Sequence, residues 1–189
     1  KLTAWQQTPD SPEASATIPM LSLEEVSPDC SLTKTIVKSE NGVTVLSHPV
    51  ATHGIVYLTM YFSLTNYSLP ELTQLTLLSE FFGELPTASY SAAELQKQIK
   101  STIGSLSFRL GSAAKNKQTE TCKPYFQVRA GLLKEKLAEA KTLLYEILTQ
   151  TKFDDSDKIR EIVLQVDDAS RQAAIGNGHA LAVSAVRAH

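Results

Sequence analysis

The chain alternates between two hydrophobic periods, and each change of period marks a change of element. Residues 33–39 and 43–47 are rich in β-branched side chains and flank Asn41-Gly42, a pair that supplies the positive φ values of a tight hairpin turn. Residues 55–64 alternate apolar and aromatic side chains over two faces, as a long strand does. The sequence therefore predicts a hairpin followed by a strand buried on at least one side.

After residue 67 the apolar positions recur about every 3.6 residues, which is the period of an α-helix. Two capping boxes, Ser68 with Glu71 and Ser91 with Glu94, predict the first turns of two helices. The first helix, expected over 69–83, is apolar nearly all round and is expected to be buried. Further elements follow in order: a second helix ending at 104, a strand over 105–110, a polar loop over 112–120, a strand over 125–130, and helices over 133–148 and 154–176.

The order of these elements defines the expected fold class. Strand groups followed by pairs of helices indicate an α+β fold, an antiparallel sheet with helices packed on one face. Strict βαβ alternation and glycine-rich phosphate loops are absent, which argues against a Rossmann-type sheet. Residues 1–19 contain Pro9, Pro12 and Pro19 and are expected to form the end of an interdomain linker, with one domain over 20–189. Both ends of the chain look cut from a longer polypeptide.

Composition narrows the partners. The 189 residues are 42% hydrophobic, enough for one sizeable core, and 18 basic side chains nearly cancel 20 acidic ones. No strong field draws the chain to nucleic acid or to a membrane, and its longest apolar stretch, 54–64, is shorter than the ~20 residues of a spanning helix. Lys97, Lys100, Phe108 and Arg109 are therefore expected to belong to a solvated surface rather than a nucleic-acid interface.

The two cysteines bear on the compartment. Cys30 and Cys122 are far apart in sequence, form no CxxC motif and have no neighbours that would activate a thiol. A soluble protein of a reducing compartment, the cytoplasm or an organelle matrix, is expected, while a single long-range disulfide stays open.

Candidate catalytic groups are sparse. The histidines are not spaced as metal ligands on a helix, so no zinc site is expected, and a His48–His53 loop site is the weaker alternative to solvated side chains. The adjacent carboxylates of Asp154-Asp155 and Asp167-Asp168 point about 100° apart on a helix and are expected to cap or solvate it. No nucleophile motif is present. The histidines concerned are His48, His53, His179 and His189.

Several strings, in order, resemble one peptidase family. Residues 17–25 (TIPMLSLEE), 41–46 (NGVTVL), 54–57 (GIVY), 85–87, 103–107 and 176–180 are similar to the C-terminal half of presequence proteases. These enzymes are a branch of the pitrilysin/insulinase zinc metallopeptidases. The resemblance covers roughly residues 5–189 and implies the repeated α+β domain of that family.

The resemblance also implies where zinc is and is not bound. Active halves of the family carry His-x-x-Glu-His on the first helix after the third strand, and the corresponding positions here are Leu77, Glu80 and Phe81. Both ligand positions are apolar, so Glu80 is expected to be a solvated or paired helix residue, and no zinc or catalytic residue is expected in this chain. Glu161 stands on a later helix suited to a third ligand. The zinc is expected in the N-terminal half of the parent protein.

The resemblance implies a supporting role. The chain is expected to be the first domain of the non-catalytic C-terminal half, forming part of the wall of a chamber in which unstructured peptides are cut. Its partners would be the catalytic N-terminal half, the following C-terminal domain and the peptide, while its substrate-binding residues stay unassigned. Two alternatives remain: a non-catalytic structural subunit like the core proteins of respiratory complexes, or an unrelated peptide-binding module.

Overall fold

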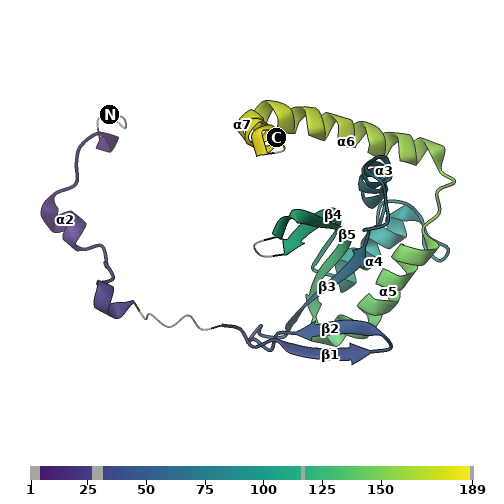
Figure 1. The fold of residues 1–189 in the computed structure, drawn as a ribbon, viewed down its shortest axis with the longest axis horizontal. Helices are drawn as coiled ribbons and strands as arrows, with labels where there is room; N and C mark the ends of the chain where they lie inside the picture. Colours follow the sequence, from purple (N-terminus) through teal and green to yellow (C-terminus); the bar gives the residue numbers. More distant parts are fainter. Residues whose placement is uncertain (1–4, 27–31, 116–117, 188–189) are drawn as a thin grey trace. The chain divides into compact units, whose positions relative to one another are not determined.

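The computed structural model describes residues 5–26, 32–115 and 118–187, and two compact units make up the chain (Figure 1). The first unit is Lys1–Ala51 and the second is Thr52–His189. The division falls after Ala51 and not after residue 19, so a single domain over 20–189 remains a prediction. Cys30 and His189 lie outside the described residues.

The first unit contains the predicted hairpin. Strands β1 (Ile36–Glu40) and β2 (Val43–Ser47) pair antiparallel, with Glu40 opposite Val43. Asn41 and Gly42 adopt φ values of 52° and 79°, which a two-residue hairpin turn requires and which few other residue types accept. The unit also holds a short helix, α2 (Pro12–Ala16), inside the expected linker, and a 3₁₀ helix at Leu23–Glu25.

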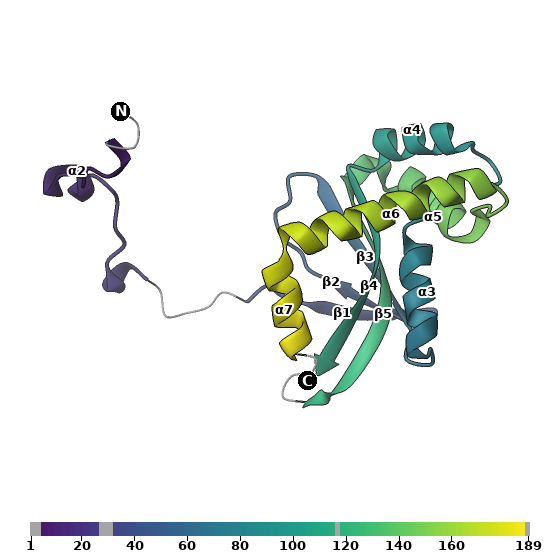
Figure 2. The same ribbon diagram turned by 90° about the horizontal axis from the view of Figure 1, so that it is seen from above.

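The second unit is built on a three-stranded antiparallel sheet. Strand β5 (Gln118–Leu133) lies between β3 (Ile55–Ser63) and β4 (Ser105–Lys115), in the order β3-β5-β4 (Figure 2). The α+β class is confirmed. The loop expected over 112–120 is wrong, because β4 and β5 continue as a paired ribbon, with Ala113 opposite Lys123. Backbone hydrogen bonds hold a ladder without apolar side chains, so the small and polar residues here gave no strand signal.

One face of this sheet carries the hydrophobic core. Helices α4 (Ala92–Thr102) and α5 (Leu137–Gln150) pack on the even-numbered positions of the strands, and a 3₁₀ helix, Lys134–Lys136, leads into α5. Leu95, Val128 and Ile147 are fully buried there. Ser91 caps α4 as expected, since its hydroxyl accepts the Glu94 N–H while the Glu94 carboxylate accepts the Ser91 N–H. The arrangement therefore has helices on one face of the sheet, as predicted.

Helix α3 (Leu69–Ser79) differs from the expectation in two ways. It ends at Ser79, with Glu80 as its C-cap, and Gly83 then turns the chain at φ 83°. It is also not buried: Ser79 is its only buried residue, and Leu69 is 77% exposed. The prediction of a buried helix was wrong because an apolar sequence does not say whether the same chain supplies a cover on every side.

Two helices complete the second unit. Helix α6 (Ser156–Gly176) begins where the acidic residues predicted it, and the Asp155 carboxylate accepts the Lys158 N–H at 2.9 Å. Helix α7 (Gly178–Arg187) follows. In the part of the chain that the structure describes, no helix has the length and apolar character needed to span a membrane. Ile159, Ile162 and Val166 of α6 pack near Phe81 and Leu85 in a second, smaller core.

Candidate functional site

The three positions that match the zinc motif lie at the end of α3 and do not share one surface. Leu77 is 38% exposed and lines a groove, whereas Phe81 is 8% exposed and belongs to the second core. The Phe81 ring meets the Phe153 ring edge to face at 6.2 Å. Because the α-helix ends at Ser79, residues 77, 80 and 81 do not follow the single helical face on which the motif depends.

The chemistry of these side chains does not fit a zinc ion. Leu77 and Phe81 offer no lone pair, and zinc sites in proteins use nitrogen, sulfur or oxygen donors. Glu80 is exposed and is the only donor among the three. Within the described residues, no group of three or more His, Cys, Asp or Glu side chains is placed to hold a metal. No step of catalysis through zinc can be derived from this chain.

Glu161, the residue considered for a third ligand, is engaged on its own helix. Its carboxylate pairs with Lys158 Nζ at 3.0 Å and accepts a hydrogen bond from Gln165 Nε2 at 3.1 Å. The neighbouring Ile162 is the residue that points into the second core. The structure therefore gives Glu161 a surface role and does not bring it to Leu77 or Phe81.

The remaining candidate acids and bases have structural partners or lie on the surface. Asp155 caps α6, and Asp167 pairs with Arg171 at 3.0 Å. In the first unit, the imidazole Nδ1 of His48 lies 3.3 Å from the Thr35 hydroxyl. In the second unit, His53 takes a φ of 51° next to Gly54 in the turn before β3. Capping and surface interactions account for these groups without a catalytic role.

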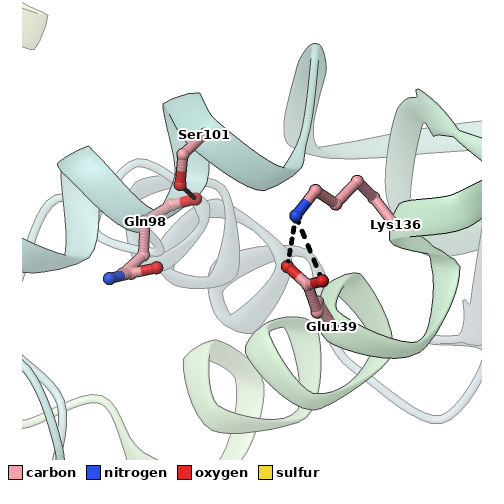
Figure 3. A network of polar contacts seen from close by, with 4 residues as sticks. All are labelled: Gln98, Ser101, Lys136 and Glu139. Atoms are coloured by element: carbon pink, nitrogen blue, oxygen red, sulfur yellow. Dashed lines mark hydrogen bonds and ion pairs between the residues drawn. The ribbon is translucent and has the colours of Figure 1, made fainter.

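A polar hollow between α4 and α5 is also held by structural contacts. It has a volume of about 340 Å³ and is lined by Glu139 and Glu146 among other residues. Figure 3 shows Glu139 bound to Lys136, at 2.8 Å, and Ser101 Oγ donating to the Gln98 carbonyl on its own helix. Hydrogen bonds from the Thr87 hydroxyl and then the Ser89 backbone lower the pKa of Glu146.

These contacts decide what the hollow can do. The Glu146 carboxylate accepts the Ser89 N–H at 2.9 Å and so ties the loop before α4 to α5. An exposed carboxylate with a lowered pKa is ionised near neutral pH and is a weak base. The hollow is therefore part of the packing between the helices and the loop.

An apolar groove of about 690 Å³ runs along α3. Helix α3 forms one wall with Leu69, Leu72 and Leu77, and the ends of β4 and β5 contribute Leu110 and Cys122. Cys122 is exposed. The groove carries no cluster of polar groups that would bind a small substrate, so its character is that of an uncovered packing surface.

The sheet face opposite the core has a different character. We call it the open face; it consists of the odd-numbered positions of 55–63, 105–113 and 121–133. Tyr57 and Tyr61 are each 62% exposed there, and Arg109 and Arg129 are exposed. Gln127 is 5% exposed, and its Oε1 accepts the Nε–H of Arg109 at 2.6 Å.

The open face separates residues that looked like one group in the sequence. Phe108 points into the core, where its ring lies 5.4 Å from Phe82, while Arg109 lies on the opposite face. Lys97 and Lys100 are exposed on α4. The four residues do not form one interface. The odd-numbered parity of Arg109 and Arg129 was the available signal for the open face, but their proximity depends on the strand register.

The family of the chain follows from comparison with known proteins. The model of the family described as associated with M16 peptidases of subfamily C matches residues 1–189, so the chain belongs to that family. The sequence resemblance to presequence proteases of the pitrilysin family is confirmed. The chain is a peptidase-associated segment.

Particular relatives support this assignment. "Protein HypA" of Clostridium perfringens is 32% identical over 98% of the chain, and presequence protease 1 of Arabidopsis thaliana, chloroplastic/mitochondrial, is 26% identical over 97%. The mitochondrial presequence protease of Drosophila melanogaster is 20% identical over 88%. The aligned region makes up 19%, 17% and 16% of these proteins, so the chain spans less than a fifth of the length of each.

Proposed function

We propose that this chain is a non-catalytic segment of a longer zinc metalloendopeptidase that degrades unstructured peptides. The segment forms part of the wall of the chamber in which the peptide is cut. The zinc is bound in the N-terminal half of the parent protein, and that half and the following C-terminal domain are the segment's partners. The observation that carries the proposal is the family match together with the side chains at 77, 80 and 81.

The exposed apolar surfaces support a role among neighbouring domains. Leu69 and Leu77 of α3 and Leu164 of α6 are 77%, 38% and 55% exposed. A domain that works alone seldom exposes this much apolar surface next to a groove. Contacts with other parts of a longer chain would cover it.

The structural-subunit alternative shares the fold and differs in the parent. A non-catalytic relative would lack the His-x-x-Glu-His motif in its N-terminal half, and no part of it would hydrolyse peptides. The family match disfavours the other alternative, an unrelated binding module. The sequence upstream of Lys1 and an activity measurement on the parent protein distinguish the two that remain.

The test compares the parent protein with this chain alone. We expect the parent to cleave a quenched fluorescent peptide and to lose that activity with a chelator, while the 189-residue chain cleaves nothing. A parent that binds no zinc and cleaves no unstructured peptide would support the structural-subunit alternative. A chain that cleaves by itself would contradict the assignment to the wall.

A further inference from the structure

The open face combines positive charge with exposed tyrosines. Its odd-numbered positions carry Arg109, Lys123 and Arg129 and no Asp or Glu, although the whole chain has a net charge of −2. No ion pair between described residues engages any of the three cations. The face is therefore locally cationic on a chain that is not.

The strand register brings the two arginines together. Arg129 lies opposite Ser107, and Arg109 is two residues further along β4, opposite Gln127. Diagonal positions of this kind are separated by about 7–8 Å, within the reach of two neighbouring side chains of one extended peptide. Thr59 flanks Arg129 on the other side, from β3.

The two arginines are presented differently. The nearly buried Gln127 holds the Nε–H of Arg109, which leaves the two terminal nitrogens of its guanidinium for a ligand. A guanidinium fork matches the two oxygens of a carboxylate, and a side chain that is already oriented loses less entropy when it binds. Arg109 thus provides an oriented carboxylate site.

The tyrosines line the same surface. Tyr61 meets Tyr125 edge to face with ring centroids 5.1 Å apart, and Tyr125 lies over Gly111, where a Cβ would come within 2.8 Å of its ring. Tyr57 lies over Gly131 in the same way, at 3.6 Å. Rings laid flat on glycines keep the face shallow, so that an extended chain can lie across it.

We propose that the open face binds acidic segments of the peptide substrate, with Arg109 and Arg129 each taking a carboxylate. This inference rests on the proposed function, because it gives a substrate preference to the chamber wall. Charge complementarity favours the acidic peptide over a cationic one, for which the face offers no carboxylate. The net negative charge of the chain disfavours nucleic acid as the occupant.

The test uses the parent protein and two labelled peptides that differ only in charge. One contains several glutamates and the other has glutamine at the same positions, and both are made of D-amino acids so that binding is measured without hydrolysis. Fluorescence anisotropy is expected to show tighter binding of the acidic peptide. The double variant Arg109→Gln/Arg129→Gln is expected to weaken that binding roughly three- to tenfold and to leave the glutamine peptide unchanged, as two exposed ion pairs would.

A matched control removes the same charge elsewhere. Lys97→Gln/Lys100→Gln takes two cations from α4, away from the open face, and is expected to leave both affinities unchanged. Arg109→Lys keeps the charge but loses the fork, so an intermediate loss is expected. Salt raised from about 0.05 M to about 0.5 M is expected to abolish the preference, since exposed charges are screened over a few ångströms at that ionic strength. Circular dichroism of each variant checks that it is folded.

Several results would overturn the inference. These are equal affinity for the two peptides, an equal loss in the lysine control, or stronger and arginine-dependent binding of a single-stranded oligonucleotide. Hydrolysis of the corresponding L-peptides is measured separately. If the parent cleaves neither L-peptide, the proposed function fails, while the anisotropy result still decides whether the open face binds acidic peptides.

Discussion

The core between the sheet and helices α4 and α5 supports a quantitative prediction at Leu95. This residue of α4 is 0% exposed and packs with Val128 of β5 and Ile147 of α5 in the larger core. Replacing it with alanine removes three carbon atoms from a site enclosed on all sides. Leu69, at the start of α3, is 77% exposed and serves as the matched control for the same substitution.

The expected loss follows from two contributions. Burial of about three methylene groups stabilises the fold by ~2.4 kcal/mol at ~0.8 kcal/mol each. The cavity left by an incompletely relaxed core adds to this, so Leu95→Ala is expected to lower the free energy of unfolding by ~3–4 kcal/mol. Leu69→Ala is expected to change it by less than ~0.5 kcal/mol, since the side chain is already in water and both residues favour helix.

Urea denaturation followed by far-ultraviolet circular dichroism measures both values. The midpoint should fall for Leu95→Ala, with little change in the slope of the free energy against urea. A loss below ~1 kcal/mol at Leu95 would mean that α4 does not cover the sheet. Equal losses at the two leucines would mean that α3 is buried, and would refute the exposure of that helix.

Three further predictions concern the sheet, a helix cap and the motif positions. Gly111→Ala is expected to destabilise the chain by ~1–3 kcal/mol because its Cβ would lie 2.8 Å from the Tyr125 ring; a neutral result in thermal unfolding would mean the ring does not lie there. Hydrogen bonds at the start of α4 lower the pKa of Glu94 below its usual 4.5, so its stabilisation is present above about that pH and is lost as the pH falls through the folded-state pKa. Glu94→Gln should therefore flatten the acid limb of a stability–pH curve, and an unchanged curve would contradict the cap. Leu77→His/Phe81→His is expected to be destabilised and inactive in a peptide-cleavage assay, because an imidazole at the buried position 81 leaves polar atoms unpaired; chelator-sensitive cleavage would show a surviving zinc shell.

Matched variants serve as controls for these three predictions. Gly178→Ala is the control for the sheet, because nothing lies within 4 Å of the added Cβ. Leu77→His alone is the control for the double variant, since this position is 38% exposed and should accept an imidazole without loss of the fold. For the cap, the unmodified chain measured over the same pH range is the reference.

Local signals in the sequence predicted the hairpin, the helix starts and the α+β class. Asn41-Gly42 can hardly serve another turn, and the Ser91–Glu94 capping box satisfies its own backbone groups, so neither needs information from distant residues. The exposure of α3 and the length of the β4–β5 ribbon could not be predicted in this way. Both depend on which surfaces meet in the folded chain, and an apolar helix or a polar strand looks the same in sequence whether or not it is covered.

The candidate sites show the same limit. The apolar character of Leu77 and Phe81 could be read directly, and it carries the proposal that this segment does not bind zinc. The open face could not, since Arg109 and Arg129 are far apart in sequence and become neighbours only through the register of β4 with β5. Alternation assigns the face of each side chain, whereas the pairing of strands assigns its neighbours.

The central claim is that this chain supports a peptidase without carrying its metal site. The most direct measurement is the zinc content of the purified 189-residue chain after chelation, addition of zinc and dialysis, together with cleavage of an unstructured fluorescent peptide by the same sample. The account predicts zinc far below one ion per chain and no cleavage, because positions 77 and 81 offer no donor atoms. One zinc per chain with cleavage that a chelator abolishes would contradict it.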